Sequence, residues 1–224
     1  MPRKDRVREL LDPSTEAMLA EHERLADLYL YNADIGEKRT SLYLTALSAS
    51  AAILVGLAQF GGGMSSLLWP SVAFLAVMLV VGLVTFYRLV ERRVRAAELL
   101  RAINRIHCYF TQNDPSLAQY FYWPPCDDKP SFFGGGTALA GLRDVVAALN
   151  SIFVGILVAA EVAALWPALH YGFAILIGAA TCVIAWLLHR LWERRSLRRA
   201  EESAARCVRF PAGWCGTQAG EAGE

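Results

Sequence analysis

The sequence predicts an all-α membrane protein with four transmembrane helices, cytoplasmic helical extensions and both termini in the cytoplasm. Two observations predict this fold class. Four apolar blocks each have the ~20 residues that an α-helix needs to cross about 30 Å of hydrocarbon. The turns that separate the first two blocks and the last two blocks contain no Lys or Arg, whereas basic residues crowd the opposite block ends.

The apolar blocks hold a large share of a chain that is 55% hydrophobic over 224 residues. Arg88, near the end of the second block, is the one Lys or Arg within the first three blocks. A buried helix of a soluble protein seldom stays uncharged for so long, so the blocks are interpreted as membrane spans. They occupy residues 41–60, 69–90, 145–166 and 171–191.

The remaining segments are expected to form helices on the cytoplasmic side. Asp12-Pro13 has the pattern of a helix start, and no strong breaker follows before Phe60. Asn113-Asp114-Pro115-Ser116 is expected to end the second long helix and to cap a short helix at 116–122, and Thr137 is expected to cap the third long helix. The expected organisation is an amphipathic N-terminal helix (1–40), a first transmembrane hairpin (41–90), a stalk with a return loop (91–144), a second hairpin (145–191), and a basic helix with a disordered tail (192–224).

Small and polar residues of the first span gather on one side of the helix. At about 100° per residue they fall on a stripe roughly 80° wide. Such a stripe is either a helix–helix contact face, because small residues let backbones approach in membranes, or the wall of a hydrophilic pore. The stripe consists of Ser41, Thr45, Ser48, Ala52, Gly56 and Gln59.

In the third span, Asn150 and Glu161 share one side of the helix. Asn150 is a candidate for hydrogen bonding between helices. Glu161 is a candidate for a bundle interior or a water-filled path, although its nearness to Trp166 also allows it to reach the outer interface. In the fourth span, small residues around Gly178 and Ala185 indicate a packing face.

Arginines and lysines beside the spans are expected to fix topology and to meet lipid headgroups. Arg101 and Arg105 lie further along the second helix and, with His107, are candidates for binding a phosphate-bearing ligand or an acidic partner; the alternative is a solvated helix face. The candidate headgroup and topology residues are Lys38, Arg39, Arg92, Arg93, Arg194 and Arg195.

An aromatic cluster in the middle segment contains Tyr120, Tyr122 and Trp123. These rings either cap the tip of the stalk or present a surface to a partner. Cysteines near it lack the paired spacing of a metal site, and the sequence contains no P-loop, nucleophile elbow or H-E-x-x-H motif. We therefore expect no enzyme activity, no catalytic residue, no cofactor and no metal.

The layout resembles the SLATT-type and related four-span pore-forming effectors of bacterial nucleotide-signalled defence systems. The resemblance covers residues 19–110, with EKRTSLYLTALSA entering the first span and RLVERRVR leaving the second. It implies self-association into a homo-oligomer, membrane permeabilisation and a role in antiviral defence. It also implies triggering by a cytoplasmic protein or a small molecule.

The sequence therefore predicts an oligomeric pore or channel-like protein of the bacterial inner membrane, with a cytoplasmic stalk that senses a signal or binds a partner. The alternative is a non-conducting membrane scaffold or regulator that recruits a cytoplasmic partner protein. The expected partners are the lipid bilayer, further copies of the chain and the trigger, and not nucleic acid.

Overall fold

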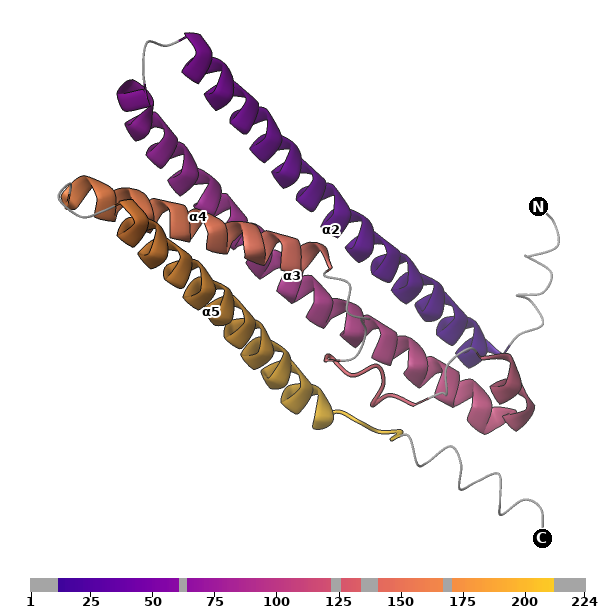
Figure 1. Cartoon of the computed structure of the whole chain (residues 1–224). Coiled ribbons are helices and arrows are strands. Elements are labelled where there is room, and N and C mark those ends of the chain that lie inside the picture. The colour runs from indigo at the N-terminus through magenta and orange to yellow at the C-terminus, as the bar shows by residue number, and fades with distance from the viewer. Residues whose placement is uncertain (1–11, 61–63, 122–125, 134–140, 167–170, 212–224) are drawn as a thin grey trace. The chain divides into compact units, whose positions relative to one another are not determined.

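The computed structural model describes residues 12–60, 64–121, 126–133, 141–166 and 171–211, without the side chains of 50, 54, 57–60 and 64–68 (Figure 1). These residues form helices and connecting segments, and no strand lies among them. The fold is thus all-helical, as the sequence predicts. The helices are α2 (Pro13–Phe60), α3 (Met64–Asn113), the 3-10 helix η1 (Pro115–Tyr120), α4 (Leu142–Leu165) and α5 (Tyr171–Ala205).

Helix α2 begins where the sequence predicts it and continues without a break to Phe60. The Asp12 carboxylate accepts a hydrogen bond from the Ser14 N–H at 3.2 Å, and the Asp12 carbonyl accepts one from the Glu16 N–H at 3.1 Å. The Asp12 side chain therefore satisfies one of the N–H groups that a helix start leaves without a partner, and the Asp12 carbonyl accepts the first hydrogen bond within the helix. Gly36 does not interrupt the helix.

Aspartates also cap the starts of η1 and α4. The Asp114 carboxylate caps η1 by accepting the Ser116 N–H at 3.0 Å, so this short helix begins one residue before the predicted start and ends at Tyr120. At α4, Asp144 accepts the Gly141 N–H at 3.1 Å. Thr137, the predicted cap, lies outside the described residues.

Among the residues that the structure describes, three helices are long and apolar enough to cross a membrane: Trp69–Asn113, Leu142–Leu165 and Tyr171–Ala205. Helix α5 extends beyond its apolar block into the predicted basic helix and ends at Ala205. The 50 residues of α3 span about 75 Å at 1.5 Å per residue, more than twice the thickness of the hydrocarbon. Its polar part, beyond the apolar block, therefore extends out of the hydrocarbon in any orientation that buries the apolar part.

The chain divides into two compact units. The first unit comprises Met1–Asp34, Arg92–Gly135 and Arg198–Glu224, and the second comprises Ile35–Glu91 and Gly136–Leu197. Helices α2, α3 and α5 contribute residues to both. Residues 212–224, for which the sequence predicts disorder, lie outside the described residues.

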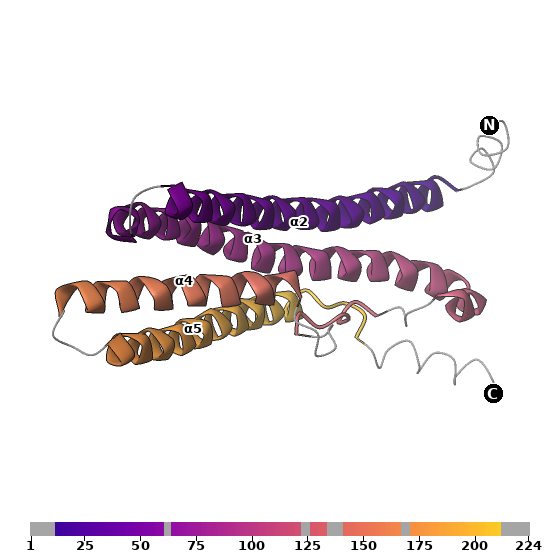
Figure 2. The same cartoon turned by 45° about the horizontal axis from the view of Figure 1, so that its top comes forward.

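In the second unit, segments of the four long helices run alongside one another (Figure 2). Its apolar core joins α2, α3 and α4. Helices α4 and α5 approach closely at Gly155 and Gly178, where a Cβ added to either glycine would lie 2.7 or 2.6 Å from the carbonyl oxygen of the other. The core residues are Tyr43, Met78, Phe86, Val90, Val146, Ala147 and Phe153.

Candidate functional site

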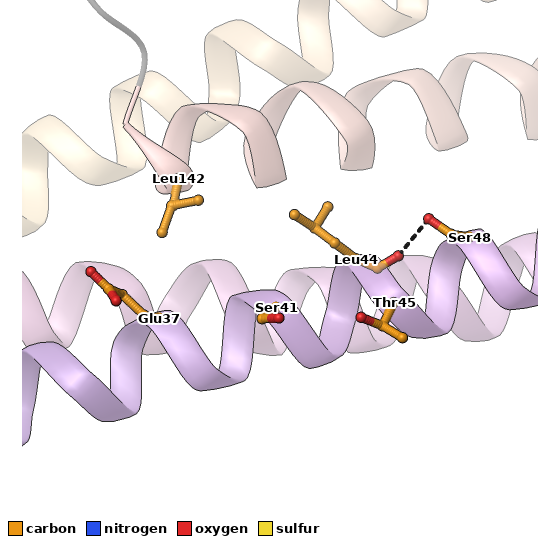
Figure 3. Close-up of a pocket in the computed structure, with 6 residues that line it drawn as sticks. All are labelled: Glu37, Ser41, Leu44, Thr45, Ser48 and Leu142. Carbon is orange, nitrogen blue, oxygen red and sulfur yellow. Dashed lines mark hydrogen bonds between the residues drawn. The ribbon is translucent and has the colours of Figure 1, made fainter.

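A groove runs along α2 beside the start of α4 (Figure 3). Its volume is ≈ 510 Å³. Three of the predicted stripe residues, Ser41, Thr45 and Ser48, line it, together with Glu37, Leu44 and Leu142. The groove is therefore built on the polar side of the first predicted span.

Helix α2 separates two kinds of polar residue by the side on which they lie. Thr40 and Tyr43 are 0% and 3% exposed and face the interior of the second unit. Ser41, Thr45 and Ser48 are exposed. The structure thus places these hydroxyls on the outside of the single chain.

The rest of the predicted stripe follows the same side. Ala52 is exposed, and a Cβ added to Gly56 would meet no atom of the described residues within 4 Å. The Ser48 hydroxyl donates to the Leu44 carbonyl at 2.9 Å, a bond within one helix turn that satisfies its hydrogen. The Gln59 side chain lies outside the described residues.

Asn150 lies between helices. It is fully buried, and its Oδ1 accepts a hydrogen bond from the Tyr43 hydroxyl of α2 at 3.4 Å. A Cβ on Gly82 of α3 would lie 1.9 Å from the same Oδ1, so that glycine makes room for the amide. This arrangement is the interhelical alternative of the sequence analysis, and it brings three helices together at one polar point.

Glu161 lies apart from that point. It is exposed, near the end of α4 where Trp166 follows the last helical residue. No described residue makes a hydrogen bond or an ion pair with it. The structure therefore does not place Glu161 in the interior of the single chain.

Charged residues connect α4 to α5 within the second unit, a feature that the sequence analysis missed. Arg143 Nη1 lies 2.7 Å from Glu193 Oε1, and Arg190 Nη1 lies 2.5 Å from Asp144 Oδ1 and 3.4 Å from Glu193 Oε2. The Glu193 side chain is only 6% exposed. Two cations and two anions thus balance each other, which lowers the cost of burying them.

Arg101, a predicted ligand residue, is instead bound inside the first unit. It is 3% exposed, and its Nε donates to the Pro130 carbonyl at 3.0 Å. Its guanidinium pairs with Glu201 of α5 at 2.5 Å and lies 4.5 Å from the centre of the Phe132 ring. Arg101 is therefore not on a solvated helix face, the alternative that the sequence had favoured, because the return loop covers it.

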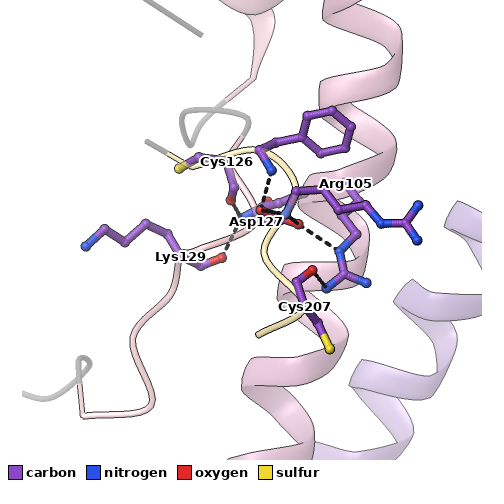
Figure 4. Close-up of polar contacts among 8 residues, drawn as sticks. Arg105, Cys126, Asp127, Lys129 and Cys207 are labelled. Carbon is purple, nitrogen blue, oxygen red and sulfur yellow. Dashed lines mark hydrogen bonds and ion pairs between the residues drawn. The ribbon is translucent and has the colours of Figure 1, made fainter. Parts of the chain in front are cut away.

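Arg105 binds a second buried carboxylate (Figure 4). Its Nε lies 2.9 Å from Asp127 Oδ2, and Asp127 is 0% exposed. The same carboxylate accepts the Arg209 and Phe210 N–H groups at 3.0 and 2.9 Å. Burial acts to raise the pKa of Asp127, but the hydrogen bonds from Arg209, Phe210 and Arg105 outweigh it and hold the pKa below the ordinary value of 3.8.

His107 contacts His22 of α2 and stacks on Phe121, with the ring centroids of the stacked pair 4.2 Å apart. Burial, followed by the nearby His22 ring, holds the pKa of His107 below its ordinary value of 6.5. Tyr120 is 76% exposed, while Tyr122 and Trp123 lie outside the described residues.

The predicted headgroup residues fall into two groups. Lys38, Arg39, Arg194 and Arg195 are exposed. Arg92 instead donates to the Asn32 carbonyl at 2.9 Å, and Arg93 donates to the carbonyls of Phe132 and Phe133 at 3.1 and 3.2 Å. In the single chain, Arg92 and Arg93 therefore stabilise the first unit.

Comparison with known proteins finds no matching family model, no curated relative and no similar solved structure. The functional interpretation therefore depends on the geometry described above. That geometry offers two distinct regions: an outward polar stripe in the second unit and an internally paired polar network in the first.

Proposed function

We propose that the chain is an oligomeric pore or channel-like protein of the bacterial inner membrane. In this proposal α2 crosses the bilayer with residues 41–60, which makes four spans and leaves both termini in the cytoplasm. The three helices that are long and apolar enough to cross support the membrane assignment. The absence of Lys and Arg from the short turns supports the orientation.

The observation that carries the proposal is the outward position of Ser41, Thr45 and Ser48 on α2. The same unit buries the Asn150 amide and balances its buried charges within itself. The single chain leaves the polar stripe of α2 outside, as it does Glu161 of α4. A second copy and a water-filled axis are the two neighbours that suit small and hydroxyl-bearing residues in a membrane.

Two further points favour assembly. The stripe is small as well as polar, and Gly56 extends it with open space around its Cα, so another helix can approach closely. The resemblance to four-span pore-forming effectors also implies a homo-oligomer. In this proposal the α2 stripes of several copies surround the axis and the first unit receives the trigger, a role that fits a defence effector.

Ion flux across liposomes tests the proposal directly. Purified protein is reconstituted, and Thr45→Leu is compared with Thr85→Leu, which removes a hydroxyl bonded to the Val81 carbonyl on α3. We expect ion flux from the wild type and from Thr85→Leu. For Thr45→Leu we expect the flux to fall by at least about tenfold, because leucine narrows the pore and excludes water from it. Equal flux from both variants would show that α2 does not line the pore.

The scaffold alternative has a different signature. An intact oligomer that shows no flux under any trigger would contradict the pore proposal. Capture of one cytoplasmic protein that is lost on Tyr120→Ala would then favour recruitment through the exposed aromatic residue of η1.

A further inference from the structure

The groove beside α4 has an acidic residue at one end (Figure 3). Glu37 lines the groove about one helical turn before Ser41, and at 100° per residue the two side chains differ in direction by only about 40°. Glu37 is exposed, and no described residue makes an ion pair or a hydrogen bond with it. Its carboxylate is therefore available to a mobile ion.

The positive charges near this groove are directed elsewhere. Among the described residues that line the groove, none is Lys or Arg. Lys38 and Arg39 follow Glu37 in the sequence, but at 100° per residue they point about 100° and 160° away from it. On α4, Arg143 is paired with Glu193 at 2.7 Å. The charge that the groove itself presents is therefore negative.

The hydroxyl groups of the groove add hydrogen-bond acceptors to this charge. The Ser48 hydroxyl donates its one hydrogen to the Leu44 carbonyl at 2.9 Å, so oxygen lone pairs are what it offers to another partner. The hydroxyls of Ser41 and Thr45 can accept as well as donate. The groove therefore suits a hydrated cation better than an anion, because the Glu37 carboxylate attracts the first and repels the second.

We propose that the pore conducts cations in preference to anions, and that Glu37 selects them at its cytoplasmic mouth. This inference rests on the proposed function, in which the polar stripe of α2 surrounds the axis, and it names the class of ion that permeates. At 1.5 Å per residue, Glu37 lies about 6 Å before Ser41, at the cytoplasmic end of the proposed span. Copies around one axis would therefore bring their Glu37 carboxylates into a ring, an arrangement that selects cations in channels.

A ring of carboxylates acts on cations and anions in opposite ways. Carboxylates that lie near one another repel, and a cation among them relieves that repulsion, whereas an anion adds to it. The apolar side chains of Leu44 and Leu142 in the groove strengthen the effect, since walls of low dielectric constant focus the field. Selection by charge alone does not require an ion to lose its hydration shell, so we expect K⁺ and Na⁺ to permeate alike.

Reversal potentials under a KCl gradient test the proposal on the reconstituted full-length protein. For the wild type we expect the permeability to K⁺ to exceed that to Cl⁻ by at least about tenfold. Glu37→Gln should still conduct, but its two permeabilities should become nearly equal because the charge is gone. Glu37→Asp should keep the preference for K⁺, and Glu37→Lys should reverse it in favour of Cl⁻.

A matched control removes a carboxylate outside the groove. Glu98 of α3 is exposed and does not line the groove, so Glu98→Gln should keep the wild-type preference for K⁺. Circular dichroism and particle mass in nanodiscs check that each variant is folded and assembled like the wild type.

A conducting wild type without preference for K⁺ over Cl⁻ would overturn the inference and leave the pore intact. The same holds for a Glu37→Gln variant that keeps the wild-type preference. Equal losses of preference in Glu37→Gln and Glu98→Gln would also overturn it, because the general surface charge would then attract K⁺. Absence of flux of either ion from the wild type would instead contradict the proposed function.

Discussion

His22 Nε2 lies 3.2 Å from His107 Nε2, so two imidazoles share a hydrogen bond between α2 and α3 in the first unit. One ring must donate and the other accept, which two imidazolium cations cannot do. The third ring at this contact, Phe121, stacks on His107 and is uncharged. The contact therefore persists only while at least one histidine is neutral.

Acidification should weaken this contact. The pKa of His107 lies below 6.5 in the folded protein, so the unfolded chain binds its proton first as the pH falls. The contribution of neutral His107 to folding stability is therefore fully present above about pH 6.5, and it is lost as the pH drops toward the folded pKa of His107. We expect the thermal unfolding midpoint in detergent to fall between pH 7.5 and 5.5, and His107→Gln to flatten that dependence. An unchanged pH slope in His107→Gln would assign the effect to other groups.

Asp127→Asn should destabilise the first unit. The substitution removes a fully buried anion that binds Arg105 and two backbone N–H groups, and it leaves the arginine without its counter-charge. Loss of hydrogen bonds to a buried charged group costs about 1.5–3 kcal/mol, whereas the 40% exposure of Arg105 screens the ion pair itself. Limited proteolysis after residue 205 and thermal unfolding measure the loss. Asp128→Asn removes the neighbouring acid and serves as the control, with a change of less than about 1 kcal/mol expected.

The Asp127 carboxylate predicts a second and more acidic pH range in which the first unit loses stability. Because the folded pKa of Asp127 lies below 3.8, its contribution is present above that pH and is lost as the pH falls through the folded pKa. In wild-type protein we expect protease sensitivity of the segment after α5 to rise below about pH 4. Asp127→Asn should already show that sensitivity at pH 7, and resistance of the variant at neutral pH would contradict the assigned role.

Gly155→Ala should force α4 and α5 apart. The added methyl group would lie 2.7 Å from the Gly178 carbonyl oxygen and 2.9 Å from Cys182 Cβ. Overpacking of this kind costs about 1–3 kcal/mol. Gly56→Ala is the matched control because its methyl group meets no described atom of the chain within 4 Å, and alanine favours the helix by about 1 kcal/mol. Thermal unfolding of the two variants should therefore shift in opposite directions.

Tyr43 and Asn150 should be energetically coupled. Tyr43→Phe removes the donor and Asn150→Ala removes the acceptor of their hydrogen bond. Hydrogen bonds between membrane helices are typically worth about 0.6 kcal/mol, so a double-mutant cycle should give a coupling energy of this size. Strict additivity of the two single changes would show that the bond contributes nothing. Thr85→Leu combined with either variant provides a non-contacting comparison.

Local sequence signals predicted the helices well. Asp12 and Asp114 cap helices because short acidic side chains reach the first N–H groups, and this chemistry depends only on near neighbours. The absence of a breaker between 13 and 60 likewise predicted one helix, since Gly36 alone costs too little to end it. Periodicity also identified Asn150 as a residue directed at another helix.

Partners that are distant in sequence were not predictable in the same way. Arg101 and Glu201 are 100 positions apart, and the return loop that covers them has no regular period. Glu193 lies in the basic run RLWERRSLRR and looks solvated until Arg143 of another helix is placed beside it. A helical pattern shows which side of a helix is buried, but the identity of the contacting side chain depends on how the helices associate.

The paired charges of Arg143, Asp144, Arg190 and Glu193 have a consequence for biogenesis. During insertion into the membrane, orientation depends on Lys and Arg, and acidic residues contribute little. In the proposed topology, Arg143 and Arg190 would act first as individual positive charges that keep their helix ends in the cytoplasm, and only after the hairpin closes as members of neutral pairs. Loss of Glu193 would then spare orientation and impair only the finished bundle, whereas loss of Arg190 would weaken both stages.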